Sequence, residues 1–127
     1  MPTFNYAAAT LPASDMGRAR KFYEETLGLE LVEETPGGVT YKVGTSQLFV
    51  YPSEFAGTNQ ATAANFEVDD IEAAVADLRG SGVTFEQYDF PGLKTDENGI
   101  AEMDGERGAW FKDPEGNILA VGQRRTS

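Results

Sequence analysis

The chain has 127 residues, of which 40% are hydrophobic and 24% are charged, and its formal net charge is −11 at pH 7. This length suits one domain with a buried core and is too short for two independent domains. The charge disfavours nucleic acid as a partner, because phosphate backbones bind clustered basic side chains. No apolar run approaches the roughly 20 residues that span a membrane, so we expect a cytoplasmic protein without a membrane partner.

The sequence contains neither histidine nor cysteine. The lack of imidazole excludes the two-histidine iron site and disfavours most zinc and nickel sites, while the lack of thiol excludes disulfides and a cysteine nucleophile. Any metal ion would need oxygen ligands, which suit magnesium, calcium or manganese. We therefore predict a protein with no cofactor.

The first half of the chain predicts one strand, one helix and three further strands. We expect a strand over residues 3–11 that Pro12 ends, and a helix that Ser14 or Asp15 caps and Gly28 ends. The three later strands are expected at residues 29–34, 39–43 and 47–51. This order is a βαβββ module.

The second half repeats this order. After a strand over residues 63–68, Asp69 or Asp70 caps the next helix, and Glu72 lies three residues after Asp69 as in a capping box. Later strands are expected at residues 83–87, in a hairpin over residues 95–103 that turns at Asn98-Gly99, and at residues 108–112 and 117–121.

The two halves also match residue by residue at a constant offset of 54. The matches pair Asp15, Ala19, Gly28, Leu29 and Leu31 with Asp69, Ala73, Gly82, Val83 and Phe85. A joint register over a whole helix and the next strand indicates an internal repeat. We predict an α+β fold built from two tandem βαβββ modules in a single domain, with module one at about residues 1–52 and module two at about residues 61–127.

A turn joins the last two expected strands. Asp113-Pro114-Glu115-Gly116 has proline at the second turn position, where its fixed φ is suitable, and glycine at the fourth. We expect a type I turn with Gly116 in the left-handed conformation, closing an antiparallel hairpin.

Three segments resemble the vicinal oxygen chelate superfamily, which contains glyoxalases, bleomycin-resistance proteins and extradiol dioxygenases. They are Phe22-Tyr23 with Leu27-Gly28-Leu29, the segment 68–74, and the Asp113-Pro114-Glu115-Gly116 turn. The resemblance implies the glyoxalase/bleomycin-resistance fold, in which the two modules form a curved mixed sheet with helices on its outer face.

The resemblance also implies four positions that hold a metal ion in the metal-dependent members. In this sequence they fall at Ala8, Phe49, Ala63 and Ala120. These side chains have no lone pairs to offer. We therefore expect no metal site, and we do not expect lactoylglutathione lyase, dioxygenase or other metal-dependent activity.

A metal-free cup with aromatic walls remains as the expected site. Alternation along the strands places Tyr6, Thr10, Asn65 and Glu67 on the same face as Ala8 and Ala63. The aromatic candidates are Tyr41, Phe49, Tyr51, Phe90 and Trp110, and the loop over residues 88–106 is the expected cover.

Two functions are compatible with this site. In the first, a homodimer binds a small molecule, such as an antibiotic or another aromatic or cationic metabolite, and sequesters it; the acidic exterior would attract such a cation. In the alternative, Glu67 is the general base of a glyoxalase-like lyase or isomerase, with Tyr6, Tyr41 or Tyr51 as hydrogen-bond donor.

Overall fold

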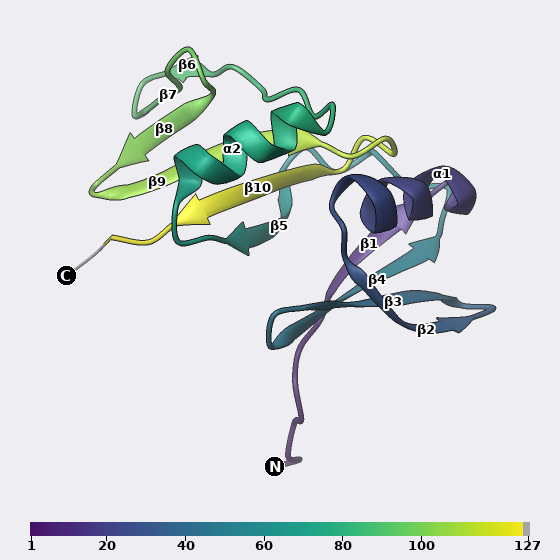
Figure 1. Ribbon diagram of the computed structural model, residues 1–127. Coiled ribbons are helices and arrows are strands. Elements are labelled where there is room, and N and C mark those ends of the chain that lie inside the picture. Colours follow the sequence, from purple (N-terminus) through teal and green to yellow (C-terminus); the bar gives the residue numbers. More distant parts are fainter. Residues whose placement is uncertain (126–127) are drawn as a thin grey trace. The chain divides into compact units, whose positions relative to one another are not determined.

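The computed structural model describes residues 1–125 (Figure 1). The described residues form two compact units: unit 1 contains Met1–Ala63 and Pro114–Asn117, and unit 2 contains Ala64–Asp113 and residues 118–125. Among the described residues, no helix is both long enough and apolar enough to cross a membrane.

Unit 1 follows the expected order of module one. It contains β1 (Ala9–Ala13), α1 (Met16–Lys21), the π-helix η1 (Phe22–Thr26), β2 (Glu30–Thr35), β3 (Gly38–Val43) and β4 (Ser46–Pro52). The strands form one sheet in the order β1-β4-β3-β2, in which β1 and β4 are parallel and the other pairs are antiparallel. The core consists of Leu11, Ala19, Tyr23, Val39, Tyr41, Leu48 and Val50.

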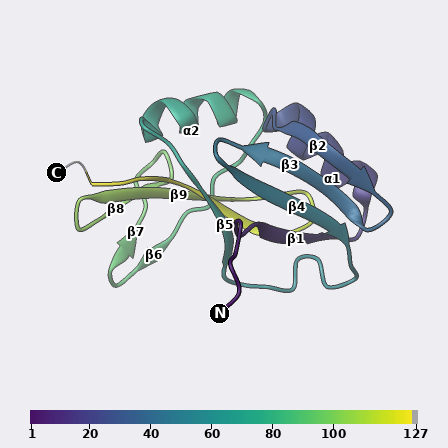
Figure 2. The ribbon, with the colours of Figure 1, turned by 90° about the horizontal axis from the view of Figure 1, so that it is seen from below.

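Unit 2 repeats this arrangement. It contains most of β5 (Thr62–Glu67), α2 (Ile71–Gly80), the short strands β6 (Asp89–Phe90) and β7 (Leu93–Lys94), β8 (Ile100–Met103), β9 (Glu106–Lys112) and β10 (Ile118–Gln123). The main sheet has the order β5-β10-β9-β8, and α2 lies along one of its faces (Figures 1 and 2). The predicted α+β fold of two βαβββ modules is confirmed.

The two helices begin in the same way but differ in length. Asp15 caps α1 by accepting a hydrogen bond from the Arg18 amide, and Asp70 caps α2 by accepting one from the Ala73 amide. Gly28 and Gly82 follow the two helices with positive φ angles, as expected of residues that end a helix. From cap to glycine, module one spans 28 − 15 = 13 residues and module two spans 82 − 70 = 12.

This difference decides between the two predicted caps of α2. The cap is Asp70, because the helix starts where Ile71 is fully buried against the sheet. The capping box with Glu72 therefore does not form, and the Glu72 carboxylate lies 3.7 Å from Arg107 instead. The offset of 54 holds at the glycines only because η1 accommodates one extra residue, as π-helical turns do.

Pro12 lies inside β1 and does not end it, contrary to the prediction. It pairs in register with Tyr51 of β4, and its carbonyl accepts a hydrogen bond from Nδ2 of Asn117 at 2.8 Å. In a strand, the N–H and C=O of one residue point the same way, so the missing N–H faces away from β4. A proline fits there without loss of a ladder bond, and the strand covers Ala9–Ala13 rather than residues 3–11.

The strand predicted at residues 83–87 is reduced to one bridge between Phe85 and Phe111. The predicted hairpin that turns at Asn98-Gly99 is confirmed, because Thr95 bridges Ala101 and the Asp96 carboxylate accepts hydrogen bonds from the amides of Asn98 and Ile100. The hairpin of β9 and β10 also forms as predicted, with Ala120 opposite Trp110.

The turn between β9 and β10 has the predicted left-handed Gly116, with φ of 85°. Its Glu115 carboxylate is fully buried in unit 1. It accepts hydrogen bonds from the amide and hydroxyl of Ser14 and from the Asp15 amide, and it pairs with the Arg18 guanidinium at 2.6 Å. Burial opposes ionisation, but these donors outweigh it and hold the pKa of Glu115 below its ordinary value.

Candidate functional site

The sheet of unit 2 has one face against α2 and one open face. Phe111 and Leu119 are fully buried on the α2 side, where Ile71 and Val75 are also buried. Their neighbours Trp110 and Ala120 form a cross-strand pair, and alternation turns that pair to the open face. A hollow of about 350 Å³ lies there.

Trp110 forms the aromatic wall of this hollow. Its indole lies over Gly108, where an added Cβ would be only 3.3 Å from Cη2 of the ring. The Tyr88 ring meets the indole edge to face at 5.7 Å, and the Phe90 ring stacks on Tyr88 at 5.8 Å. Trp110, Tyr88 and Phe90 thus form an aromatic series that leads from the hollow into the loop of β6.

Asn65 and Glu67 line the same hollow from β5, as alternation predicts. The Asn65 amide lies over Gly122, where an added Cβ would be 3.0 Å from its Oδ1. Small residues at positions 108, 120 and 122 therefore leave room on the open face for the side chains of Trp110 and Asn65. The structure brings together three of the predicted ligand-binding residues: Asn65, Glu67 and Trp110.

Two arginines follow β10 and differ in how tightly they are held. Arg125 donates a hydrogen bond to Asp104 at 2.8 Å, and its side chain packs beside Gly105. Arg124 lines the hollow and has its Nε 4.0 Å from the Glu67 carboxylate, too far for a hydrogen bond. Arg124 was not predicted as a site residue, although a basic pair directly after the last strand of an acidic chain is a visible signal.

Unit 1 carries a second aromatic face, on the side of its sheet away from α1. Thr10 of β1 and Phe49 of β4 are register partners, and the Phe49 and Tyr51 rings stack at 6.0 Å. Tyr6 precedes β1 and is exposed. The predicted ligand-binding residues are therefore divided between two faces, one in each unit.

Tyr41 is a correction to the predicted set. It is fully buried on the opposite side of the sheet, paired with Leu48, and its ring stacks on Tyr23. Its hydroxyl donates a hydrogen bond to Glu24 at 2.8 Å. Burial and this hydrogen bond raise the pKa of Tyr41. Tyr41 therefore belongs to the core and cannot share a ligand with Thr10 and Phe49.

The residues at the four positions where the resemblance predicts metal ligands do not fit a metal ion. Ala120 lies on the open face of unit 2, and Phe49 lies on the corresponding face of unit 1. Neither of these side chains, nor those of Ala8 and Ala63, contains a donor atom. Within residues 1–125, no group of three or more acidic side chains gathers to supply oxygen ligands instead.

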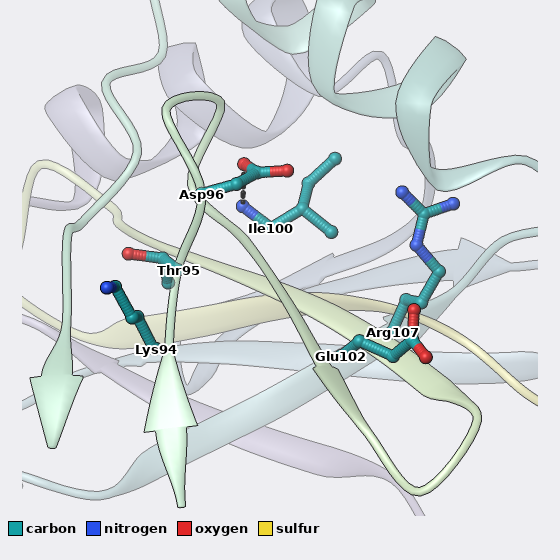
Figure 3. A pocket seen from close by; sticks show the side chains of 6 residues that line it. All are labelled: Lys94, Thr95, Asp96, Ile100, Glu102 and Arg107. Carbon is teal, nitrogen blue, oxygen red and sulfur yellow. Dashed lines mark hydrogen bonds between the residues drawn. The ribbon is translucent and has the colours of Figure 1, made fainter. Parts of the chain in front are cut away.

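A second hollow in unit 2, of about 380 Å³, is lined by Lys94, Thr95, Asp96, Ile100, Glu102 and Arg107 (Figure 3). Its inner polar groups already hold the local turns. The Thr95 hydroxyl contacts Gln87 and Tyr88, and the Asp96 carboxylate accepts from the Ile100 amide. The side chains of Thr95 and Asp96 are therefore already engaged in hydrogen bonds within the chain, which leaves fewer polar groups for a ligand in this hollow.

Comparison with known proteins agrees with these features. The model of the Glyoxalase/Bleomycin resistance protein/Dioxygenase superfamily matches residues 3–121. The chain belongs to this superfamily. A search of curated proteins found no match.

Several solved structures share the fold. UcmS2 superposes with a TM-score of 0.74 at 18% identity, covering 95% of this chain and 98% of that one. Lactoylglutathione lyase from Agrobacterium tumefaciens gives 0.64 at 23% identity, covering 97% and 96%. TnmS3, an antibiotic binding protein from Streptomyces sp. CB03234, gives 0.63 at 22% identity, covering 97% and 98%. At these identities the likeness shows the fold alone.

Proposed function

We propose that the protein binds a small aromatic molecule on the open face of unit 2 and holds it unchanged, as a sequestering protein does. The observation that carries this proposal is the pairing of Trp110 with Ala120 above a hollow of about 350 Å³. An indole supplies a large apolar surface with one polar edge. Alanine at a family metal position leaves space beside the indole and supplies no donor for a catalytic metal.

Two further features support binding of this kind. Asn65 and Glu67 place polar groups beside the side chains of Trp110 and Ala120, and polar groups next to an aromatic surface can fix the orientation of a ligand. The net charge of −11 favours the approach of cationic ligands through long-range attraction. TnmS3, with the same fold, is described as an antibiotic binding protein, and an antibiotic is one candidate ligand here.

The experiment uses the single tryptophan of the chain, Trp110. Aromatic compounds, including antibiotics, are screened by thermal shift and by Trp110 fluorescence, each with and without added divalent ions. We expect a ligand that raises Tm without metal, changes Trp110 emission and is recovered unchanged by mass spectrometry. A strict requirement for a divalent ion would contradict the proposal.

Two variants make the screen specific to the site. Trp110→Leu should abolish ligand stabilisation. Phe55→Leu is the matched control, because Phe55 is an exposed aromatic residue of a unit 1 loop that no proposed site contains. Equal loss in both variants would show that the ligand does not bind at the Trp110 face.

The second candidate function is a lyase or isomerase with Glu67 as general base. The observation that favours it is the position of Glu67 on the wall of the hollow. If a compound from the screen is converted, Glu67→Gln should abolish the conversion while the compound still changes Trp110 emission. Conversion that persists in Glu67→Gln would remove this candidate.

We also propose that Thr10, Phe49 and Tyr51 form a second ligand surface and that the protein is a homodimer. Exposed Phe4 and Tyr6, in a segment without charged side chains, support association of two copies. Sedimentation equilibrium of the protein and of a Phe4→Ser/Tyr6→Ser variant tests this, and a wild-type monomer would contradict it.

A further inference from the structure

The Trp110 hollow has an aromatic part and a charged part. Trp110 and Ala120 form the first, and four charged side chains line the second: Glu67, Glu106, Arg107 and Arg124. Arg107 lies 3.7 Å from the Glu72 carboxylate, whereas Glu67 and Arg124 face each other and are accessible: the Arg124 side chain is 85% exposed and that of Glu67 is 42% exposed. A ligand stacked on the indole can therefore extend toward both charges.

The Glu67–Arg124 pair is loosely held. The distance of 4.0 Å between its charged groups contrasts with the 2.8 Å hydrogen bond of the neighbouring Arg125–Asp104 pair. Exposed ion pairs of this kind contribute little to stability, so separating the two charges costs little. Charge-assisted hydrogen bonds to a ligand are about twice as strong as neutral ones.

The signs of the two charges restrict the ligand. The hollow has two acidic and two basic side chains. A purely cationic ligand that pairs with Glu67 would meet repulsion from Arg124 and Arg107, and a purely anionic ligand that pairs with Arg124 would meet repulsion from Glu67 and Glu106. A ligand that carries an ammonium and a carboxylate can pair with both residues at once. The chain has a net charge of −11, but this does not disfavour such a zwitterion, because the net charge of the zwitterion is zero.

The size of the hollow restricts the ligand further. Its volume of about 350 Å³ lies at the lower end of the roughly 300–1,000 Å³ range of ligand pockets. A single ring system with a short polar chain suits this volume within unit 2.

We propose that the open face of unit 2 recognises aromatic zwitterions of the α-amino acid type. The ring packs against Trp110, the ammonium pairs with Glu67 and the carboxylate pairs with Arg124. This inference rests on the proposed function, since it names the ligand class of the same face.

The experiment compares three probes with the same ring. Phenylalanine carries both charges, phenylalaninamide keeps only the ammonium, and N-acetylphenylalanine keeps only the carboxylate. Because the chain has one tryptophan, the single indole N–H cross-peak in a ¹H–¹⁵N spectrum reports binding at Trp110. We expect phenylalanine to bind about tenfold more tightly than either derivative, as the loss of one hydrogen bond to a charged group predicts.

Charge variants assign the two contacts. Arg124→Gln should remove the preference for phenylalanine over phenylalaninamide, and Glu67→Gln should remove the preference over N-acetylphenylalanine. Arg125→Gln is the matched control, because it removes a neighbouring positive charge that is bound to Asp104. It should leave both preferences unchanged.

The failure of this inference differs from that of the proposed function. Equal binding of the three probes, or no binding of phenylalanine while uncharged aromatic compounds still shift the indole peak, overturns the zwitterion assignment and leaves aromatic binding intact. If no aromatic compound shifts the peak, both proposals fail.

Discussion

The two modules share one order of strands but place their bulky side chains differently. In unit 1, Phe49 on β4 faces Thr40 on β3, whereas in unit 2, Ala120 on β10 faces Trp110 on β9. The large residue of the pair is on β4 in unit 1, but in unit 2 it is on β9, the neighbour of β10. In unit 2 this leaves only a small side chain on β10 beside the indole, and the hollow lies there. A repeat of the backbone therefore does not repeat the site.

The two helix starts also differ in the side chain that accepts hydrogen bonds from their amides. At the start of α1 the buried Glu115 carboxylate accepts from Ser14 and Asp15, and at the start of α2 the amide oxygen of Gln123 accepts from the Ile71 amide at 2.8 Å. Both acceptors come from the last hairpin of the chain, but only Glu115 is charged. This predicts that the two starts respond differently to mutation and pH.

The largest expected effect is that of Glu115→Ala. The change leaves the amide donors of Ser14 and Asp15 without their acceptor and removes the partner of Arg18. We expect the free energy of unfolding to fall by about 3 kcal/mol, in the range for breaking a buried charged hydrogen-bond cluster. Urea denaturation measures this loss. The control is Glu54→Ala, because Glu54 is an exposed acidic residue without a partner in the described structure. A loss below about 1 kcal/mol would contradict this account.

The next effect concerns ligand affinity. Ala120→Phe places on β10 the side chain that Phe49 has on β4, so it should fill the hollow and weaken ligand binding about 100-fold, or by about 2.7 kcal/mol. Titration followed at the Trp110 indole measures this. Ala76→Phe makes the same substitution on the exposed side of α2 and should bind normally. Unchanged affinity in Ala120→Phe would show that the ligand does not bind on the face that contains Ala120.

A third effect follows from the lowered pKa of Glu115. Its ordinary value is 4.5 and its folded value is lower, so the unfolded chain takes up the proton first as pH falls. The stabilisation is complete above the ordinary pKa and is lost as pH falls through the folded pKa. Unfolding measured from pH 5 down to pH 3 should therefore show a steeper loss for the wild type than for Glu115→Gln. Parallel curves would assign the acid sensitivity to other carboxylates.

The smallest effect is that of Gln123→Ala at the start of α2. It removes one neutral hydrogen bond to the Ile71 amide, so we expect a loss of about 1 kcal/mol without pH dependence. Gln47→Ala is a suitable control, since Gln47 lies on β4 in unit 1 and is distant from either helix start in sequence. A loss as large as that of Glu115→Ala would remove the proposed difference between the two helix starts.

Local sequence patterns predicted much of the fold but less of the site. The turn at Gly116 and the helix end at Gly28 depend on the conformation of single residues, so local chemistry was sufficient. The face of Tyr41 depends on its register with Leu48, and no pattern within residues 39–43 reveals that register. Asn65, Glu67 and Trp110 were placed on one face because alternation along each strand needs only one reference residue.

The sequence by itself determined the superfamily and the two modules, because these depend on residue identity and spacing. Only the tertiary structure decided which partners the polar groups meet. Pro12 fits inside β1 because its missing N–H faces away from β4, on the side where Asn117, far along the chain, donates to the Pro12 carbonyl. Glu115 is ionised in the interior because three residues from the start of α1 converge on it. Such contacts join residues about 100 positions apart, and local propensity contains no information about them.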